Sequence, residues 1–444
     1  MSRARKKTIP FRFGDKHKAY IRECDKCTYN IAEGAVRAGK TIDNVFAFAH
    51  ALKASKDRLH IATGSTMANA KLNIGDANGF GLEYIFRGQC KWSKYRDNDA
   101  LIIKGPATGN REKIVIFAGG AKADSYKKIR GNSYGMWIAT EINLHHETFI
   151  KEVFNRTVAA HDRRFFWDLN PTQPRHPIYT QYIDKYREKA EKGELLGGCN
   201  YEAFTLNDNA TISDTRKEEI KSQYEPGSIW YKRDILGERI AAEGAIYTQI
   251  IEHLEKYEGS IEPGELDEIA IGVDFGGNKS GHAFVARGYE NDYENLWALA
   301  SRRIMAGPEG SIDPVELNRE LLRFIDFVEN KYGNVDYVYW DNAESVLGAS
   351  IRNAIGEKYP DIIVRPARKI AIIDRIKALI KLIAQERFYI TEDCESLKEA
   401  LHDAVWDSKK TDDVRLDDNT SDIDSLDAFE YTFERDIKRL VREY

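Results

Sequence analysis

The first half of the chain alternates short apolar runs with segments of helical periodicity. Five apolar runs predict strands, at residues 29–32, 59–63, 113–117, 136–140 and 164–167. A helix is predicted over residues 41–52, after the loop that follows the first run, and a more polar helical stretch runs from about 181 to 194. Short strands joined by helices indicate an α/β domain with a largely parallel sheet.

A second α/β region begins near residue 264. Residues 269–274 and 335–341 are apolar runs that each end in an acid, and residues 282–287 predict the returning strand of a hairpin. Residues 370–385 predict an amphipathic helix, and residues 424–435 predict another. The pattern divides the chain into three parts: residues 1–198, a lid or linker region at residues 199–263, and residues 264–444.

Length and composition agree with a chain of several folded domains. The 444 residues exceed one ordinary domain, and 42% hydrophobic with 31% charged residues is a soluble globular mixture. No run approaches the roughly 20 apolar residues that cross a bilayer, so we expect no membrane association and a cytoplasmic location. The net charge of −5 neither indicates nor excludes a nucleic-acid partner, since binding depends on local patches.

Residues 34–41 read GAVRAGKT, a complete P-loop of the form G-x4-G-K-T. Gly34 and Gly39 allow backbone N–H groups to close around a phosphate chain. Lys40 reaches the β- and γ-phosphates, and Thr41 offers its hydroxyl to Mg²⁺. Because a predicted strand precedes the loop and a predicted helix follows it, we expect ATP to bind here, with Arg37 inside the loop.

A P-loop needs a second strand that supplies acid, and residues 135–142 (GMWIATEI) have that form. The usual pair is Asp-Glu, in which the first residue orients Mg²⁺ and the second activates the attacking water. Here Thr140 stands in the first position. We therefore expect Thr41 and Thr140 to complete the coordination of Mg²⁺ with one carboxylate fewer than the usual pair provides. Glu141 keeps the position of the general base; the alternative is that it ends a core strand and caps the next segment.

Three further features of the first half have two interpretations each. Arg37 or Arg130 could be an arginine finger on the γ-phosphate, or each could serve loop solubility or a structural ion pair. Asn170 and Pro171 follow the strand at 164–167 as an ordinary turn signal. In a motor, the same position could sense the γ-phosphate.

Four aspartates predict a second centre in the other half of the chain. Asp274 and Asp341 end two strands, and Asp424 and Asp427 share one face of a predicted helix because they are three residues apart. Carboxylates from two strands and one helix can hold two Mg²⁺ ions for phosphodiester cleavage. Taken singly, each acid is more often a cap or a solvated charge.

The order of these motifs resembles the large terminase subunit of tailed double-stranded DNA phages. The resemblance rests on the P-loop, the Arg-Gly at 130–131, the acid strand, Asn-Pro, VDFG at 273–276, WDNAE at 340–344 and the final D-x-x-DA. It runs from about residue 25 to 435. It implies a P-loop ATPase of RecA/ASCE-like fold that drives DNA into a procapsid, followed by an RNase H-like nuclease that cuts concatemeric DNA.

The resemblance also implies roles for individual residues. Lys40 and Thr41 become the phosphate and Mg²⁺ ligands, and Glu141 the catalytic glutamate. Arg130 matches an arginine proposed to act on the adjacent subunit, and it ranks above Arg37, which sits one place later than the family's loop arginine. The remaining matches are the coupling residues Asn170 and Pro171 and the metal-binding nuclease acids Asp274, Asp341 and Asp427, with Asp424 where members carry His or Asp.

The implied cofactors are ATP and Mg²⁺, with Mn²⁺ as an alternative at the nuclease. The implied partners are double-stranded DNA, the portal protein, the small terminase subunit and further copies of the chain in a ring on the procapsid, whether or not the chain is a monomer in solution. The implied location is the host cytoplasm and, transiently, the portal vertex, not the mature virion. Two other hypotheses remain open: a helicase–nuclease of DNA repair, and a structural or binding protein with a degenerate ATP site.

Overall fold

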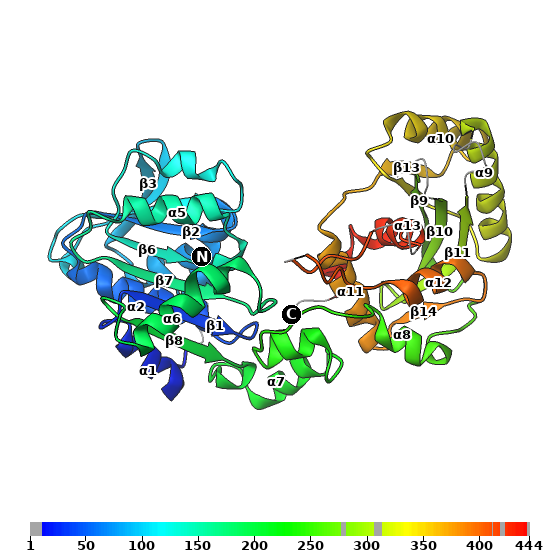
Figure 1. Ribbon diagram of the computed structural model, residues 1–444. Helices are drawn as coiled ribbons and strands as arrows, with labels where there is room; N and C mark the ends of the chain where they lie inside the picture. The colour runs from blue at the N-terminus through cyan, green and yellow to red at the C-terminus, as the bar shows by residue number, and fades with distance from the viewer. Residues whose placement is uncertain (1–10, 277–280, 306–312, 411, 418–421, 442–444) are drawn as a thin grey trace, which may run out of the picture. The chain divides into compact units, whose positions relative to one another are not determined.

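The computed structural model describes residues 11–276, 281–305, 313–410, 412–417 and 422–441. The chain forms two compact units (Figure 1). The first unit consists of the residues up to Lys221 and of Pro226–Ala241. The second unit consists of Ser222–Glu225 and of the residues from Ala242 onward. No helix among the described residues is long and apolar enough to span a membrane.

The first unit is built on an eight-stranded mixed sheet. The strand order is β3-β4-β5-β2-β6-β7-β1-β8. Pairing is parallel from β5 to β8, whereas β3 and β4 form an antiparallel hairpin at one edge. The strands are β1 (Tyr29–Gly34), β2 (Leu59–Gly64), β3 (Cys90–Tyr95), β4 (Asn98–Ile103), β5 (Lys113–Gly119), β6 (Met136–Ala139), β7 (Arg164–Leu169) and β8 (Cys199–Phe204).

The five strands predicted for this half are confirmed, and so is the largely parallel pairing. The hairpin and β8 were not predicted. Strand β8 begins at the expected boundary between the first part and the linker, and it pairs with β1 in the first sheet. The three-part division of the chain stays a prediction.

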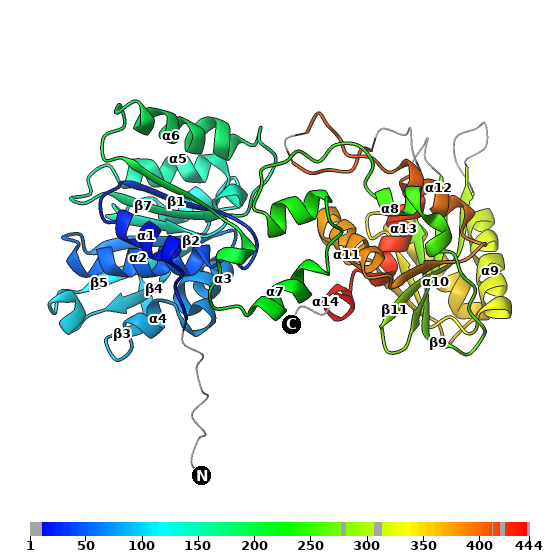
Figure 2. The same ribbon diagram turned by 90° about the horizontal axis from the view of Figure 1, so that it is seen from below.

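Helices cover both faces of the first sheet. In Figure 2, α5 and α6 lie on one side of β1 and β7, and α1 and α2 lie on the other. Side chains alternate between these faces along each strand. On β7, Phe166 contacts Phe48 of α2, and Trp167 contacts Phe154 of α5. The helices are α1 (Asp15–Glu23), α2 (Lys40–Ala54), α3 (Met67–Ala70), α4 (Leu82–Ile85), α5 (Glu147–Arg156), α6 (Asp184–Glu191) and α7 (Asp214–Lys221).

The second unit contains a six-stranded mixed sheet in the order β13-β12-β9-β10-β11-β14. The central three strands are antiparallel, and β12, β13 and β14 join in parallel at the two edges. The predicted hairpin is confirmed as β9 and β10. The strands are β9 (Leu266–Asp274), β10 (His282–Glu290), β11 (Asn295–Ile304), β12 (Tyr337–Trp340), β13 (Ile363–Pro366) and β14 (Phe388–Ile390).

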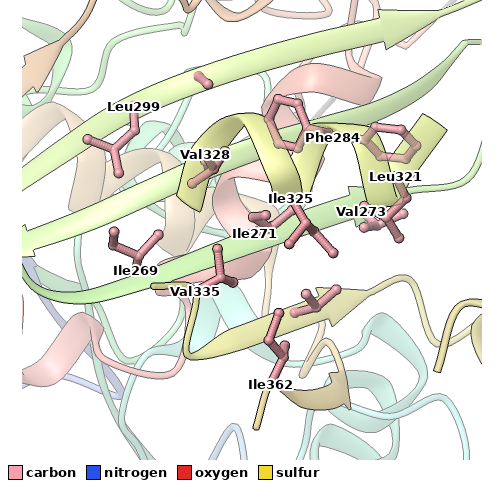
Figure 3. Close-up of a cluster of buried hydrophobic side chains, with 14 of the residues drawn as sticks. Ile269, Ile271, Val273, Phe284, Leu299, Leu321, Ile325, Val328, Val335 and Ile362 are labelled. Carbon is pink, nitrogen blue, oxygen red and sulfur yellow. The ribbon is translucent and has the colours of Figure 1, made fainter. Parts of the chain in front are cut away.

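Helix α9 (Pro314–Lys331) packs its apolar stripe on one face of this sheet. Asp313 caps the helix by accepting a hydrogen bond from Val315 N at 2.9 Å. Figure 3 shows Leu321, Ile325 and Val328 of the helix against the sheet's buried side chains. The other helices of this unit are α8 (Thr248–Glu252), α10 (Ser345–Lys358), α11 (Ile372–Ala384), α12 (Glu395–Asp403), α13 (Asp424–Phe433) and α14 (Ile437–Leu440).

Helix α13 packs on β9 and β10 and approaches β9 with no room for a side chain at one point. A Cβ built on Gly272 would lie 1.7 Å from the Ala428 carbonyl oxygen. This close approach brings the start of α13, which carries Asp424 and Asp427, to the end of β9, which carries Asp274.

We therefore expect Gly272→Ala to lower the free energy of unfolding by about 1–3 kcal/mol, because the added methyl group overpacks the contact between helix and strand. Gly356→Ala is the matched control, since a Cβ at Gly356 on α10 meets no atom within 4 Å. It should leave stability unchanged or raise it slightly. Thermal unfolding of the two variants measures the difference; equal midpoints would contradict the close approach.

Candidate nucleotide and metal sites

The phosphate loop runs from the end of β1 to the start of α2, as predicted. Gly34 and Gly39 have φ angles of 143° and 99°, and a Cβ on Gly34 would lie 1.9 Å from the Phe204 carbonyl oxygen. Both glycines are thus required by the backbone of the loop. Arg37 adopts φ of 60°, and its side chain is exposed.

A later segment of the chain braces this loop. Ala35 N donates to the Phe204 carbonyl oxygen at 2.7 Å, and Val36 N donates to the Asp234 carbonyl oxygen at 3.0 Å. Gly237, at φ of 73°, lies so near that a Cβ there would be 3.1 Å from Ala35 N. The conformation of the loop is therefore held by backbone contacts with two later parts of the chain, at Phe204 and at Asp234–Gly237.

Lys40 is buried at the head of α2, with 6% of its surface exposed. Its Nζ donates to the Ala35 carbonyl oxygen at 2.6 Å and to Asn170 Oδ1 at 3.1 Å. Burial lowers the pKa of Lys40 to about 8, against the opposing charge of Asp168. Asn170 thus touches the P-loop lysine, and Pro171, next to it, is buried.

Thr140 and Glu141 follow β6, where the sequence placed them. Thr140 Oγ1 donates to Asp168 Oδ1 at 3.2 Å, and Glu141 N donates to the same oxygen at 3.1 Å. Burial raises the pKa of Asp168, while the Glu141 N–H, the Lys40 charge and the Thr41 hydroxyl oppose the rise. Asp168 is a member of this site that the sequence analysis did not single out.

Arg130 follows the short helical turn Ser125–Ile129 on the surface. Its side chain is 56% exposed, with Nε 3.4 Å from a Glu152 carboxylate oxygen. The guanidinium also lies over the ring of Tyr126, 4.4 Å from its centroid. Within its own unit, Arg130 is therefore held at the surface by an ion pair and a cation–π contact.

A buried ion pair stands immediately before the phosphate loop. Glu33 is 1% exposed, and its carboxylate accepts hydrogen bonds from Tyr179 and Tyr201 at 2.6 and 2.8 Å. Arg239 donates to both carboxylate oxygens through Nε and Nη2, at 2.6–3.0 Å. This bidentate pair connects the end of β1 to the last residues of the first unit.

The aspartates predicted for the second centre lie at the C-terminal ends of the parallel strands β9 and β12 and in the first turn of α13. Asp274 ends β9 with 8% of its surface exposed, and Tyr431 of α13 donates to its Oδ1 at 3.0 Å. Burial raises the pKa of Asp274, and the negative charges of Asp427, Asp424 and Asp341 raise it further. Side chains far apart in sequence therefore act on one another here.

Each of the other three carboxylates forms an ion pair with a basic side chain. Lys369 contacts Asp341. The other two pairs are Arg303 with Asp424 at 2.9 Å and Arg415 with Asp427 at 2.6 Å. Among the described residues, no three acidic, histidine or cysteine side chains lie close enough together to enclose a metal ion. The donors fit Mg²⁺ or Mn²⁺ by type, because all are oxygen atoms, and the basic side chains supply positive charge where metal ions would otherwise supply it.

A comparison with protein families matches residues 31–253 to the N-terminal family of T4likevirus-type large terminase subunits. The chain belongs to the large terminase family. No curated protein matches its sequence.

Solved structures extend the likeness of this terminase to the whole chain. The large terminase of a thermophilic bacteriophage aligns with a TM-score of 0.78 at 20% identity, over 96% of this chain and 99% of that chain. The same phage protein in complex with ADP aligns with a TM-score of 0.75 at 20% identity, over 96% of this chain and 99% of that chain. In complex with ATP-γ-S it aligns with a TM-score of 0.72 at 20% identity, over 94% of this chain and 98% of that chain. The predicted fold class, an α/β protein with two successive sheets like those of a large terminase, is confirmed.

Lys40 also gives this terminase a pH dependence that can be measured. The lysine must be protonated to pair with phosphate, and in the free protein it is protonated below about pH 8. Affinity for ATP should therefore be full below pH 8 and fall by up to about tenfold for each pH unit above it.

Calorimetric titration with ATP between pH 7 and 10 measures this dependence. Lys40→Arg serves as the control, because an arginine stays charged over this range; whatever affinity it has should vary little. An affinity of the wild-type protein that does not change up to pH 10 would contradict the lowered pKa.

Proposed function

We propose that this terminase is a DNA-packaging motor that hydrolyses ATP in its first unit and cuts DNA in its second. One observation carries the proposal: a buried P-loop lysine in contact with Asn170 and a cluster of four aspartates occur in separate units of one terminase chain. Two of the similar structures from the thermophilic phage hold ADP and ATP-γ-S. By analogy, we assign ATP to the phosphate loop of this chain.

In the first unit, Lys40 binds the β- and γ-phosphates, Thr41 supplies a hydroxyl to Mg²⁺, and Glu141 accepts a proton from the attacking water. When bound, Mg²⁺ neutralises the developing charge of the phosphoryl group. Asn170 touches Lys40, so loss of the γ-phosphate changes the contact that this side chain makes. That contact supports Asn170 and Pro171 as the coupling residues.

We assign the arginine finger to Arg130, acting on the nucleotide of a neighbouring copy in the ring. Its exposure supports a role outside its own subunit, since an arginine on the γ-phosphate must leave its resting contacts. Arg37 is exposed within the loop and is the second candidate.

In the second unit, Asp274, Asp341, Asp424 and Asp427 hold two Mg²⁺ or Mn²⁺ ions. When bound, such ions would supply an activated water and stabilise the leaving oxygen of the cleaved phosphodiester. Tyr431 orients Asp274 through its hydrogen bond. Lys369, Arg303 and Arg415 balance the carboxylates before the metal ions arrive.

The proposed partners are double-stranded DNA, the portal protein, the small terminase subunit and further copies of this chain in a ring on the procapsid. The proposed location is the host cytoplasm and, during packaging, the portal vertex. We retain the three-part division of the chain, with the ATPase at residues 1–198, the lid or linker at 199–263 and the nuclease at 264–444.

The two activities should be separable by single substitutions in the full chain. Lys40→Ala should lower ATP hydrolysis by at least about 100-fold, because a charge that stabilises the transition state is lost. It should still nick plasmid with Mg²⁺ or Mn²⁺. Asp274→Asn should abolish nicking and leave ATP hydrolysis within about twofold of wild type, since its charge is used only in the other unit.

Asp361→Asn is the control for the second unit, since Asp361 is an exposed aspartate of that unit; both of its activities should match wild type. ATP hydrolysis by Lys40→Ala at the wild-type rate would overturn the motor. Plasmid nicking by Asp274→Asn at the wild-type rate would overturn the nuclease site.

DNA binding should be directed mainly at phosphates and should weaken as salt rises. A plot of the logarithm of the affinity against the logarithm of the salt concentration should be linear, with a negative slope of about 0.9 for each phosphate contacted. Fluorescence anisotropy with two unrelated duplexes of equal length measures both the slope and the independence of sequence. A flat plot would contradict binding through phosphates.

A further inference from the structure

The acid strand of the first unit ends in Thr140, where a P-loop ATPase normally carries the aspartate that orients Mg²⁺. We propose that Asp168, at the end of the adjacent strand β7, supplies that carboxylate and positions the Mg²⁺ of the bound nucleotide. The inference rests on the proposed ATPase function and adds a residue to its site.

Strand order brings Asp168 to the required place. Strand β7 lies between β6, which ends at Thr140, and β1, which leads into the phosphate loop. Phe166 points to the face that α2 covers, and Trp167 points to the face of α5. Asp168, two residues after Phe166, therefore points to the face of α2, whose first turn contains Thr41.

The contacts of Asp168 leave one oxygen for a ligand. The side chain is 3% exposed. Oδ1 accepts from Thr140 Oγ1 and from Glu141 N. Oδ2 is buried and accepts no hydrogen bond from any described residue. A buried carboxylate oxygen without a donor destabilises the free protein, and a cation, or the water that a cation carries, removes this cost.

The neighbours of Asp168 are those that a nucleotide-bound Mg²⁺ would have. The Thr41 hydroxyl, the P-loop ligand of Mg²⁺, stabilises the ionised carboxylate of Asp168. Thr140 donates a hydrogen bond that fixes the orientation of the Asp168 carboxylate. Residues that hydrogen-bond to metal ligands commonly orient them in this way. In the proposed site, the carboxylate is therefore supplied by the end of β7 and not by the end of β6.

The experiment measures nucleotide binding as well as turnover. ATP-γ-S is titrated into the full chain by calorimetry, once in EDTA and once in Mg²⁺. Wild type should bind more tightly with Mg²⁺. Asp168→Asn should keep its affinity in EDTA within about twofold and lose about tenfold or more of the gain that Mg²⁺ provides. Electron paramagnetic resonance of Mn²⁺ with ATP-γ-S should show the altered coordination directly.

Two further variants keep the proposal falsifiable. Asp214→Asn, at a fully exposed carboxylate of the same unit, should behave as wild type. The double variant Asp168→Asn with Thr140→Asp returns the carboxylate to the usual strand and should recover the gain from Mg²⁺. Thermal unfolding identifies any variant that is not folded.

The outcomes are distinct. An unchanged gain from Mg²⁺ in Asp168→Asn would overturn the assignment. Loss of affinity in EDTA as well, without recovery by Thr140→Asp, would assign Asp168 to the structure of the loop instead. If the wild-type protein binds no nucleotide in either condition, the proposed ATPase function and this inference both fail. If the wild-type protein binds nucleotide, the proposed ATPase function is retained whatever the Asp168 variant does.

Discussion

Carboxylates that are withdrawn from water must find donors or opposite charges, and this constraint shapes both centres. Glu33, before the phosphate loop, meets it with Arg239 and two tyrosines. Glu430, three residues after Asp427 on α13, meets it with Arg415 and Arg375, at 3.0 and 3.2 Å. Unpaired, either charge would cost several kcal/mol. The P-loop and helix α13 are therefore held by electrostatic pairs as well as by apolar packing.

The same constraint is met only in part at the two places where chemistry is expected. Asp168 retains a buried oxygen with no donor among the described residues, and Asp274 lies among like charges that make its ionisation unfavourable. The protein relieves both conditions only in part, and a bound cation would relieve them further. Glu430 also keeps one buried oxygen without a hydrogen-bond donor, but two arginines pair with its charge.

Local pattern predicted the strands, the phosphate loop and the acids at strand ends, because each depends on residues close together in sequence. The hairpin β3–β4 was missed, since β3 is mostly polar and exposed at the edge of the sheet. Asp168 was passed over because its role depends on β7 lying beside both β6 and β1, which spacing does not reveal. The counterions of the nuclease acids were missed for the same reason: Lys369 and Arg415 arrive from distant segments.

The stretch from Asp234 to Arg239 braces the phosphate loop and pairs with Glu33, and the chain enters the second unit directly afterwards, at Ala242. The residues that brace the phosphate loop therefore lie immediately before the point where the chain enters the second unit. A chimera that exchanges the second unit between terminases should therefore keep residues up to Ala241 together with the first unit.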